Sequence, residues 1–224
     1  MNNFFNQKIV VISPHPDDET LGLGGSLLRF AENGAEISIL VVSGHLPPLY
    51  QEASFLKTQT EAIKAYELMG VTNYEFAKIP ATYINQKPVS ELNFIISDFI
   101  QKIKPNIVFI PFFDRHIDHR VIFDASVVAC RPNFKGFPRY VMAYETLSET
   151  HWNVPGVEPQ FAPEFFIDIS SYIDRKIEIL NCFESQIINN DSRSAEACKS
   201  LARFRGSQNG CKYAESFKIV RIVV

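Results

Sequence analysis

The sequence predicts an α/β fold: a Rossmann-like three-layer sandwich with a mostly parallel sheet in the middle. The first observation is a set of continuous apolar, β-branched runs at residues 8–13, 36–43 and 106–111, which is typical of strands covered on both faces. The second is that segments with helical periodicity separate these runs, and such alternation implies right-handed βαβ units. We expect a strand order of about 3-2-1-4-5, followed by further strands near the C-terminus.

Helices are expected where apolar residues recur with helical spacing and a cap, a glycine or a proline marks an end. They cover residues 21–32 after a candidate cap at Thr20, residues 52–69 before Gly70, residues 92–103 before Pro105, and about 121–130. Each of these segments lies between two predicted strands, so each can serve as the crossover of a βαβ unit.

The remaining elements have weaker patterns. Strands are expected at residues 74–79, 140–146, 165–169 and 217–224, and a helix from residue 171 to about Ile188. Residues 151–163 are rich in proline and lack periodicity, which favours a long ordered loop of the kind that lines a site. Because no internal repeat or linker interrupts the chain, we expect residues 1–224 to form a single domain.

Composition excludes several classes of protein. The chain has 22 basic and 25 acidic side chains and no lysine or arginine block, so nucleic acid is not an expected partner. No apolar run approaches the ~20 residues of a membrane span, and residues 1–7 lack the pattern of a secretion signal. We therefore expect a cytoplasmic protein. Its four cysteines form no Cys-x-x-Cys pair, which favours free thiols, and a homo-oligomer is left open.

Two polar motifs follow predicted strands. The first, residues 14–19, reads Pro-His-Pro-Asp-Asp-Glu and comes directly after the strand at 8–13. The second, residues 114–119, reads Asp-Arg-His-Ile-Asp-His and follows the strand at 106–111. In a sheet of order 3-2-1-4-5 the winding reverses between these two strands, and ligands bind beyond the carboxyl ends of strands at such a reversal. The two motifs are therefore predicted to meet in one crevice.

The residue types in the two motifs indicate a catalytic metal centre. His15, Asp18 and His119 make an N,O,N ligand set that leaves positions for water and substrate, as a catalytic zinc ion requires. Asp17 is then placed to act as a general base on the metal's water. His116, oriented by Asp118, is predicted to stabilise an oxyanion or protonate a departing amine. The alternatives are a helix-capping role for Asp17 and a surface pair for His116 and Asp118.

Both motifs resemble those of the LmbE/PIG-L family of zinc-dependent N-deacetylases, which act on acetamido sugars and related glycosides. The likeness continues through Ser43-Gly44, residues 61–70 and the tail residues Arg205-Gly206, Gly210, Tyr213-Ala214-Glu215 and Phe217. It implies one zinc ion per chain held by His15, Asp18 and His119, with Asp17 as base and His116 and Asp118 as the electrostatic or acid pair. It also implies an N-acetylglucosamine-like substrate.

Residues that contact the substrate are harder to predict. His45 ends the second strand on the side of the predicted site, Trp152 can stack on a sugar face, and Arg205 and Tyr213 are candidates for its walls. The chain departs from some relatives of the resembled family, since Thr58 stands where an arginine is usual and Asp114 where some carry a tyrosine. The resemblance therefore supports the metal chemistry and leaves the sugar and its attachment open.

The working hypothesis is hydrolysis of an N-acetyl group from an amino sugar or an amino-sugar conjugate. One rival is a non-haem iron oxygenase, because two histidines and one carboxylate also bind Fe(II). A second rival is a catalytically silent sugar-binding protein of the same fold. The rivals differ in whether Asp17 and His116 have a chemical duty: the oxygenase gives neither residue a purpose, and the silent protein does not need Asp17.

Overall fold

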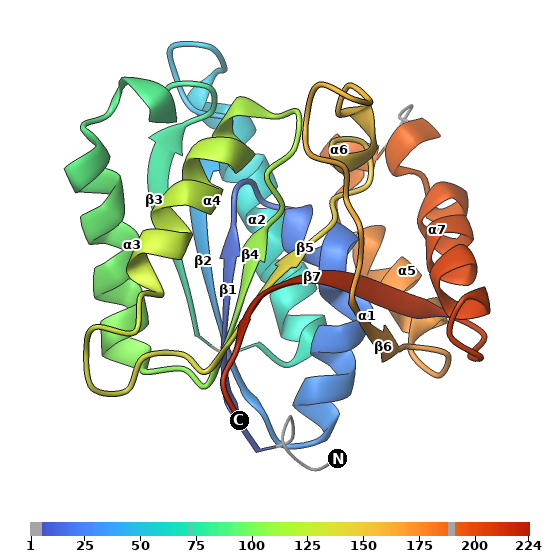
Figure 1. The fold of residues 1–224 in the computed structure, drawn as a ribbon. Helices are drawn as coiled ribbons and strands as arrows, with labels where there is room; N and C mark the ends of the chain where they lie inside the picture. The colour runs from blue at the N-terminus through green and yellow to red at the C-terminus, as the bar shows by residue number, and fades with distance from the viewer. Residues whose placement is uncertain (1–5, 72, 188–190) are drawn as a thin grey trace.

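A seven-stranded sheet of order β3-β2-β1-β4-β5-β7-β6 runs through the protein (Figure 1). The computed structural model describes residues 6–71, 73–187 and 191–224. The strands are β1 Lys8–Ser13, β2 Glu36–Gly44, β3 Asn73–Pro80, β4 Ile107–Pro111, β5 Tyr140–Tyr144, β6 Phe165–Asp168 and β7 Ala214–Ile222. Strands β1 to β5 pair in parallel, whereas β7 is antiparallel to both β5 and β6. The predicted α/β fold class and strand order are confirmed.

Helices cover both faces of the sheet. They are α1 Asp18–Glu32, α2 Glu52–Met69, α3 Val89–Ile103, α4 Ile117–Ala129, α5 Ile173–Leu180, α6 Glu184–Ile187 and α7 Ala195–Ser207, with short 3-10 turns η1 Ile84–Gln86, η2 Thr150–Trp152 and η3 Asp191–Arg193. Helices α3 and α4 pack together on one face, and α1, α2 and α5 contact one another on the other (Figure 1). Among the described residues, no helix is both long and apolar enough to cross a membrane.

The central strands are buried on both faces, which explains their continuous apolar sequences. In β1, Ile9 and Val11 belong to the core beneath α1 and α2, whereas Val10 and Ile12 belong to the core beneath α3 and α4. Successive side chains of a strand point to opposite faces, so a strand between two helix layers requires apolar residues at every position.

Three helices begin earlier than the sequence pattern predicts, and two of them begin at a polar motif. Helix α3 starts at Val89 rather than residue 92. Helix α1 starts at Asp18 rather than residue 21, so its N-cap residue is Asp17 and not Thr20. Helix α4 starts at Ile117 rather than about 121, with His116 as its N-cap. Apolar periodicity misses the first turns of α1 and α4 because they carry the carboxylates of Asp18, Glu19 and Asp118, which the free N–H groups and positive dipole of a helix start favour.

The C-terminal third departs most from prediction. The single helix expected from residue 171 is divided into α5 and α6, and its predicted end at Ile188 lies outside the described residues. Helix α7 was not predicted, and β7 begins at Ala214 rather than residue 217. Outside η2, residues 151–163 form an irregular segment, as expected.

A kink in α1 links the first motif to the C-terminal strand. Leu23 has a non-helical φ of −145°, and beyond it the backbone N–H groups of Gly25 and Ser26 donate to the Glu215 carboxylate at 2.9 and 2.6 Å. The Lys176 ammonium lies 2.6 Å from the same carboxylate and donates to the Leu21 carbonyl at 2.7 Å. Glu215 therefore caps the second part of α1, and Lys176 balances its buried charge.

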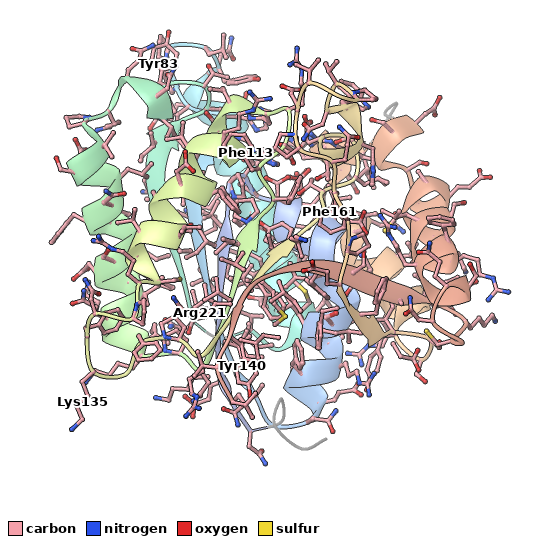
Figure 2. The ribbon with its side chains drawn as sticks, viewed as in Figure 1. Tyr83, Phe113, Lys135, Tyr140, Phe161 and Arg221 are labelled. Atoms are coloured by element: carbon pink, nitrogen blue, oxygen red, sulfur yellow. The ribbon has the colours of Figure 1, made fainter. Side chains whose placement is uncertain are left out.

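The carboxyl ends of β1, β2 and β4 point to the end of the molecule where Figure 2 labels Tyr83, away from the end that carries Lys135. Both polar motifs follow strands that end there.

Candidate metal centre

The two motifs meet because β1 and β4 are neighbours in the sheet. The His15 and His116 ring centroids are 4.7 Å apart, and the His15 and His119 centroids are 5.6 Å apart. Within the described part of the chain, His15, His116 and His119 form a group whose candidate ligand atoms lie within 4.8 Å of one another. The convergence predicted from strand order is therefore present.

Asp18 lies at the centre of this group. Its Oδ2 atom is 3.1 Å from His15 Nδ1 and 3.2 Å from His119 Nε2, and it also accepts the His15 backbone N–H at 2.9 Å. The His119 and Asp18 side chains are almost completely buried, and that of His15 is 12% exposed. One carboxylate oxygen and one nitrogen from each of two imidazoles thus face a common point.

Each of these two imidazoles has a carboxylate on its other nitrogen. His15 Nε2 lies 2.9 Å from Asp118 Oδ2, and His119 Nδ1 lies 2.9 Å from Asp114 Oδ2. Such partners fix the ring orientation and the tautomer of a metal-binding histidine. Asp114, which opens the second motif and departs from the tyrosine of some relatives, therefore has a defined contact here.

The donor set fits a divalent cation. His119 Nε2 is buried and makes no hydrogen bond, although it lies close to Asp18. The Asp17, Asp18, Asp114 and Asp118 side chains are all buried around it, and buried carboxylates require nearby positive charge. Burial alone lowers the pKa of His15, but its hydrogen bonds to Asp118 and Asp18 outweigh burial and raise it to about 9. The imidazoles of the cluster therefore hold protons at nitrogens that a metal cation can occupy instead.

Asp17 stands beside this cluster in an unusual backbone conformation. It is the N-cap residue of α1 with a φ of 139°, and its side chain is 1% exposed. Burial raises its pKa to about 7, against the opposing effect of the Arg193 guanidinium, whose Nη1 atom lies 2.9 Å from Asp17 Oδ2. A carboxylate that titrates near neutrality is suited to general base catalysis.

The predicted pairing of His116 with the Asp118 carboxylate is wrong in its geometry. The Asp118 carboxylate faces His15 and accepts the Thr82 backbone N–H at 2.9 Å, because α4 begins at Ile117 and holds Asp118 in its first turn. His116 Nδ1 instead accepts the Asp118 backbone N–H at 3.2 Å. Burial, together with the charges of His15 and His119, lowers the pKa of His116 to about 4, so the expected cationic form is not favoured. A neutral ring bonded in this way carries its proton on Nε2.

The predicted substrate contacts divide into two groups. Burial and the charges of His15 and Arg193 lower the pKa of His45 to about 4, and Trp152 ends η2 with 62% of its surface exposed. Arg205 is buried in a two-bond pair with Glu145, at 2.9 and 2.7 Å, and Tyr213 packs beside Lys199 and Lys212. Arg205 and Tyr213 therefore contact residues outside the cluster. Roles for His45 and Trp152 in substrate binding remain predictions.

Sequence reasoning missed Arg193, Glu149 and Thr82. Arg193 lies in a polar stretch with no motif, and its contact with Asp17 joins residues 176 positions apart. Thr82 contributes a backbone N–H, which no sequence pattern reveals. Only the buried charge of Asp17 signalled that a cation partner was needed.

Fold and cluster together define an α/β protein of the Rossmann-like type with a candidate metal site. The chain belongs to the PIG-L (LmbE-like) family: the family model described as GlcNAc-PI de-N-acetylase matches residues 10–130, which is more than half of the sequence. The match includes both motifs.

Individual relatives extend this result over nearly the whole chain. Diacetylchitobiose deacetylase from Thermococcus kodakarensis is 26% identical over 98% of this chain and 86% of its own. The structure of N,N'-diacetylchitobiose deacetylase from Pyrococcus horikoshii has a TM-score of 0.79 at 21% identity, covering 98% and 86% of the two chains. The structure of GalB, a 4-carboxy-2-hydroxymuconate hydratase from Pseudomonas putida KT2440, has a TM-score of 0.78 at 19% identity, covering 97% and 98%. The fold by itself therefore does not decide the reaction.

Proposed function

We propose that the protein is a zinc-dependent N-deacetylase that removes the acetyl group from an amino sugar or an amino-sugar conjugate. The observation that carries the proposal is the convergence of His15 Nδ1, Asp18 Oδ2 and His119 Nε2, with the buried Asp17 carboxylate beside them. Family membership and the deacetylase activity named for the Thermococcus kodakarensis relative support it.

His15, Asp18 and His119 are the residues that would hold the zinc ion, one per chain. When bound, zinc acts as a Lewis acid toward the amide carbonyl and lowers the pKa of water. Asp118 and Asp114 keep His15 and His119 in the ligand orientation through the nitrogens that face away from Asp18.

The proton transfers fall to the chain's own residues. Asp17 takes a proton from the attacking water, since its pKa of about 7 permits both protonation states near neutrality. His116, neutral and protonated on Nε2, donates a hydrogen bond to the developing oxyanion of the tetrahedral intermediate. Protonated Asp17 can then return its proton to the departing amine, which gives acetate and a free amino sugar.

Three other activities make different demands on the site. A non-haem iron oxygenase would give no duty to Asp17, and a silent sugar-binding protein would not need that carboxylate buried next to the cluster. A hydratase like the structural neighbour GalB would leave an acetamido group intact. The release of acetate separates the deacetylase from all three.

The test is a product assay on purified, zinc-loaded protein. We expect acetate and a free amine in equal amounts from at least one of a panel of acetamido sugars that includes N,N'-diacetylchitobiose. Asp17→Asn should reduce kcat by roughly 10²–10⁴-fold while leaving the zinc content unchanged. The matched control is Asp124→Asn, because Asp124 is an exposed aspartate on α4.

Two results would count against the proposal. One is the absence of acetate from every acetamido sugar when zinc is confirmed bound. The other is oxygen consumption by the Fe(II)-loaded protein together with no dependence on Asp17, which would favour the oxygenase.

A further inference from the structure

Arg193 joins three residues from two distant segments. Its Nη1 atom lies 2.9 Å from Asp17 Oδ2, its Nε atom donates to Ser148 Oγ at 2.7 Å, and its Nη2 atom donates to Glu149 Oε1 at 3.0 Å. The side chain is 18% exposed, so the guanidinium is largely withdrawn from water. All three nitrogens are engaged, which fixes the position of the guanidinium plane.

The residues at both ends of this bridge have strained backbones. Asp17 has a φ of 139° and Ser148 a φ of 82°, and neither is a glycine. Conformations of this kind persist only where the surrounding contacts enforce them, and they concentrate at functional sites. Arg193 bonds both side chains, so one residue from the C-terminal third holds two strained positions.

Arg193 also has a distinctive electrostatic position. Among the residues that the structure describes, it is the one arginine or lysine with an ion pair to a carboxylate of the motifs at 14–19 and 114–119. Its hydrogen bonds and ion pairs go to Asp17, Ser148 and Glu149, and none of those found among the described residues joins it to His15, Asp18 or His119. Because Arg193 engages Oδ2 of Asp17, Oδ1 is the oxygen left to receive a proton.

We propose that Arg193 is a positioning residue for the reaction: it fixes the direction of the Asp17 carboxylate and links it, through Ser148 and Glu149, to the loop that follows β5. This inference rests on the proposed function. A carboxylate next to a dication tends to rotate toward it, and the guanidinium opposes that rotation by holding one oxygen. The loop after β5 continues into η2 and Trp152, so the base and a candidate substrate contact share one support.

Kinetics of Arg193 variants test the inference on zinc-loaded protein. Arg193→Gln should lower kcat by about 10–100-fold, the usual cost of losing a group that orients an active residue, with little change in KM and unchanged zinc content. Arg193→Lys should restore part of kcat, because it keeps the positive charge. The recovery should be incomplete, because an ammonium cannot bond Asp17, Ser148 and Glu149 in the geometry of the planar guanidinium. Arg203→Gln is the matched control, since Arg203 is exposed on α7 and its guanidinium donates to the Lys212 carbonyl.

A double variant separates positioning from general damage. Glu149→Gln removes a support of Arg193 without touching Asp17, and should lower kcat less than Arg193→Gln. The combined variant should be no worse than Arg193→Gln, because both changes act through the same contact. Fully multiplicative losses, or a raised KM with unchanged kcat in Arg193→Gln, would overturn the proposal.

A second readout does not need activity. Trp152 is the protein's single tryptophan, and Glu149 is the N-cap residue of the turn that carries it. Arg193→Gln and Glu149→Gln should both lower the fluorescence anisotropy of Trp152, whereas Arg203→Gln should not. If the wild-type protein releases no acetate, the proposed function fails and the anisotropy still reports on the link. If the anisotropy of Arg193→Gln equals that of wild type, the link itself is refuted.

Discussion

The chain's first 144 residues and its last 80 contribute to the candidate site in different ways. The first region carries the five parallel strands and both polar motifs, so every proposed metal ligand comes from it. The last region supplies three charged residues that reach back to these elements over long sequence distances: Arg193 to Asp17, Lys176 to the Leu21 carbonyl, and Glu215 to the backbone of Gly25 and Ser26. It also holds the buried pair of Glu145 and Arg205. Ligand chemistry is thus encoded in short motifs, and the rigidity of the site depends on distant contacts.

The distant contacts are made by polar and charged side chains, whereas the sheet and the helices pack through apolar ones. Glu145 accepts two hydrogen bonds from Arg205 and one from Ser216 Oγ, at the end of β5 nearest the motifs. Glu215 accepts backbone N–H groups inside α1 and pairs with Lys176. A buried ion pair adds little over an apolar pair of the same shape, but losing one partner strands the other's charge. Substitutions of buried charged residues in the last region should therefore mainly lower the stability of the fold. Substitutions in the two motifs of the first region should mainly weaken metal binding.

Lys176→Met gives the largest expected effect. It leaves the buried Glu215 carboxylate without its cation and should lower the free energy of unfolding by about 3–5 kcal/mol, measured by urea unfolding of the metal-free protein. Zinc affinity of the folded protein should change much less, because Lys176 contacts α1 beyond the first motif.

The control for this prediction is Lys199→Met. Lys199 pairs with Asp174 at 2.9 Å, but both side chains are exposed, so the stability should stay close to that of wild type. A Lys176→Met protein with wild-type stability and strongly weakened zinc binding would reverse the contrast between the regions.

Asp114→Asn should mainly weaken zinc binding rather than lower stability, and its effect in free energy should be smaller than that of Lys176→Met. An amide in place of the carboxylate can present N–H to His119 Nδ1, which would move the ring proton to Nε2 and spoil that nitrogen as a ligand. We expect zinc binding to weaken by about 10–100-fold in a competitive chelator titration. Asp124→Asn, an exposed position on α4, the helix that carries His119, should bind zinc like wild type. Unchanged affinity in Asp114→Asn would show that the His119 orientation has another cause.

The same contrast explains how much of the molecule could be predicted from the sequence. The central strands followed from runs such as residues 9–12, whose apolar character at every position is typical of a strand covered on both faces. The meeting of His15 with His119 followed from topology, because both motifs end adjacent strands. Local pattern and short spacing were sufficient for these features.

Arg193, Lys176 and α7 could not be predicted in this way. Arg193 reaches Asp17 across 176 positions, and Lys176 reaches Glu215 across 39, so each pairing depends on packing that no local pattern encodes. Helix α7 has polar residues over most of its surface, and its burial of Cys198, Ala202 and Arg205 uses few apolar side chains. The role predicted for Asp118 failed for a related reason: the helix start at Ile117 decides which imidazole its carboxylate faces.

The smallest expected effect is a pH dependence of stability that belongs to the last region. Burial alone raises the pKa of Glu145, but hydrogen bonds from His151 and Arg205 outweigh it and hold the pKa below its usual value of 4.5. A carboxyl whose pKa is lower in the folded state than in the unfolded state stabilises the fold fully above the unfolded value. That stabilisation is lost as the pH falls below 4.5 and through the folded value.

Unfolding of the metal-free wild type and of Glu145→Gln between pH 7 and pH 3 checks this sign. The free-energy difference in favour of wild type should be constant above about pH 5 and should shrink as the pH falls further. Arg205→Met should flatten the pH dependence, because Glu145 then lacks its two-bond partner. A difference that widens in acid would mean that Glu145 is protonated in the folded protein, so the polar contacts of the last region would stabilise the site through shape and not through charge.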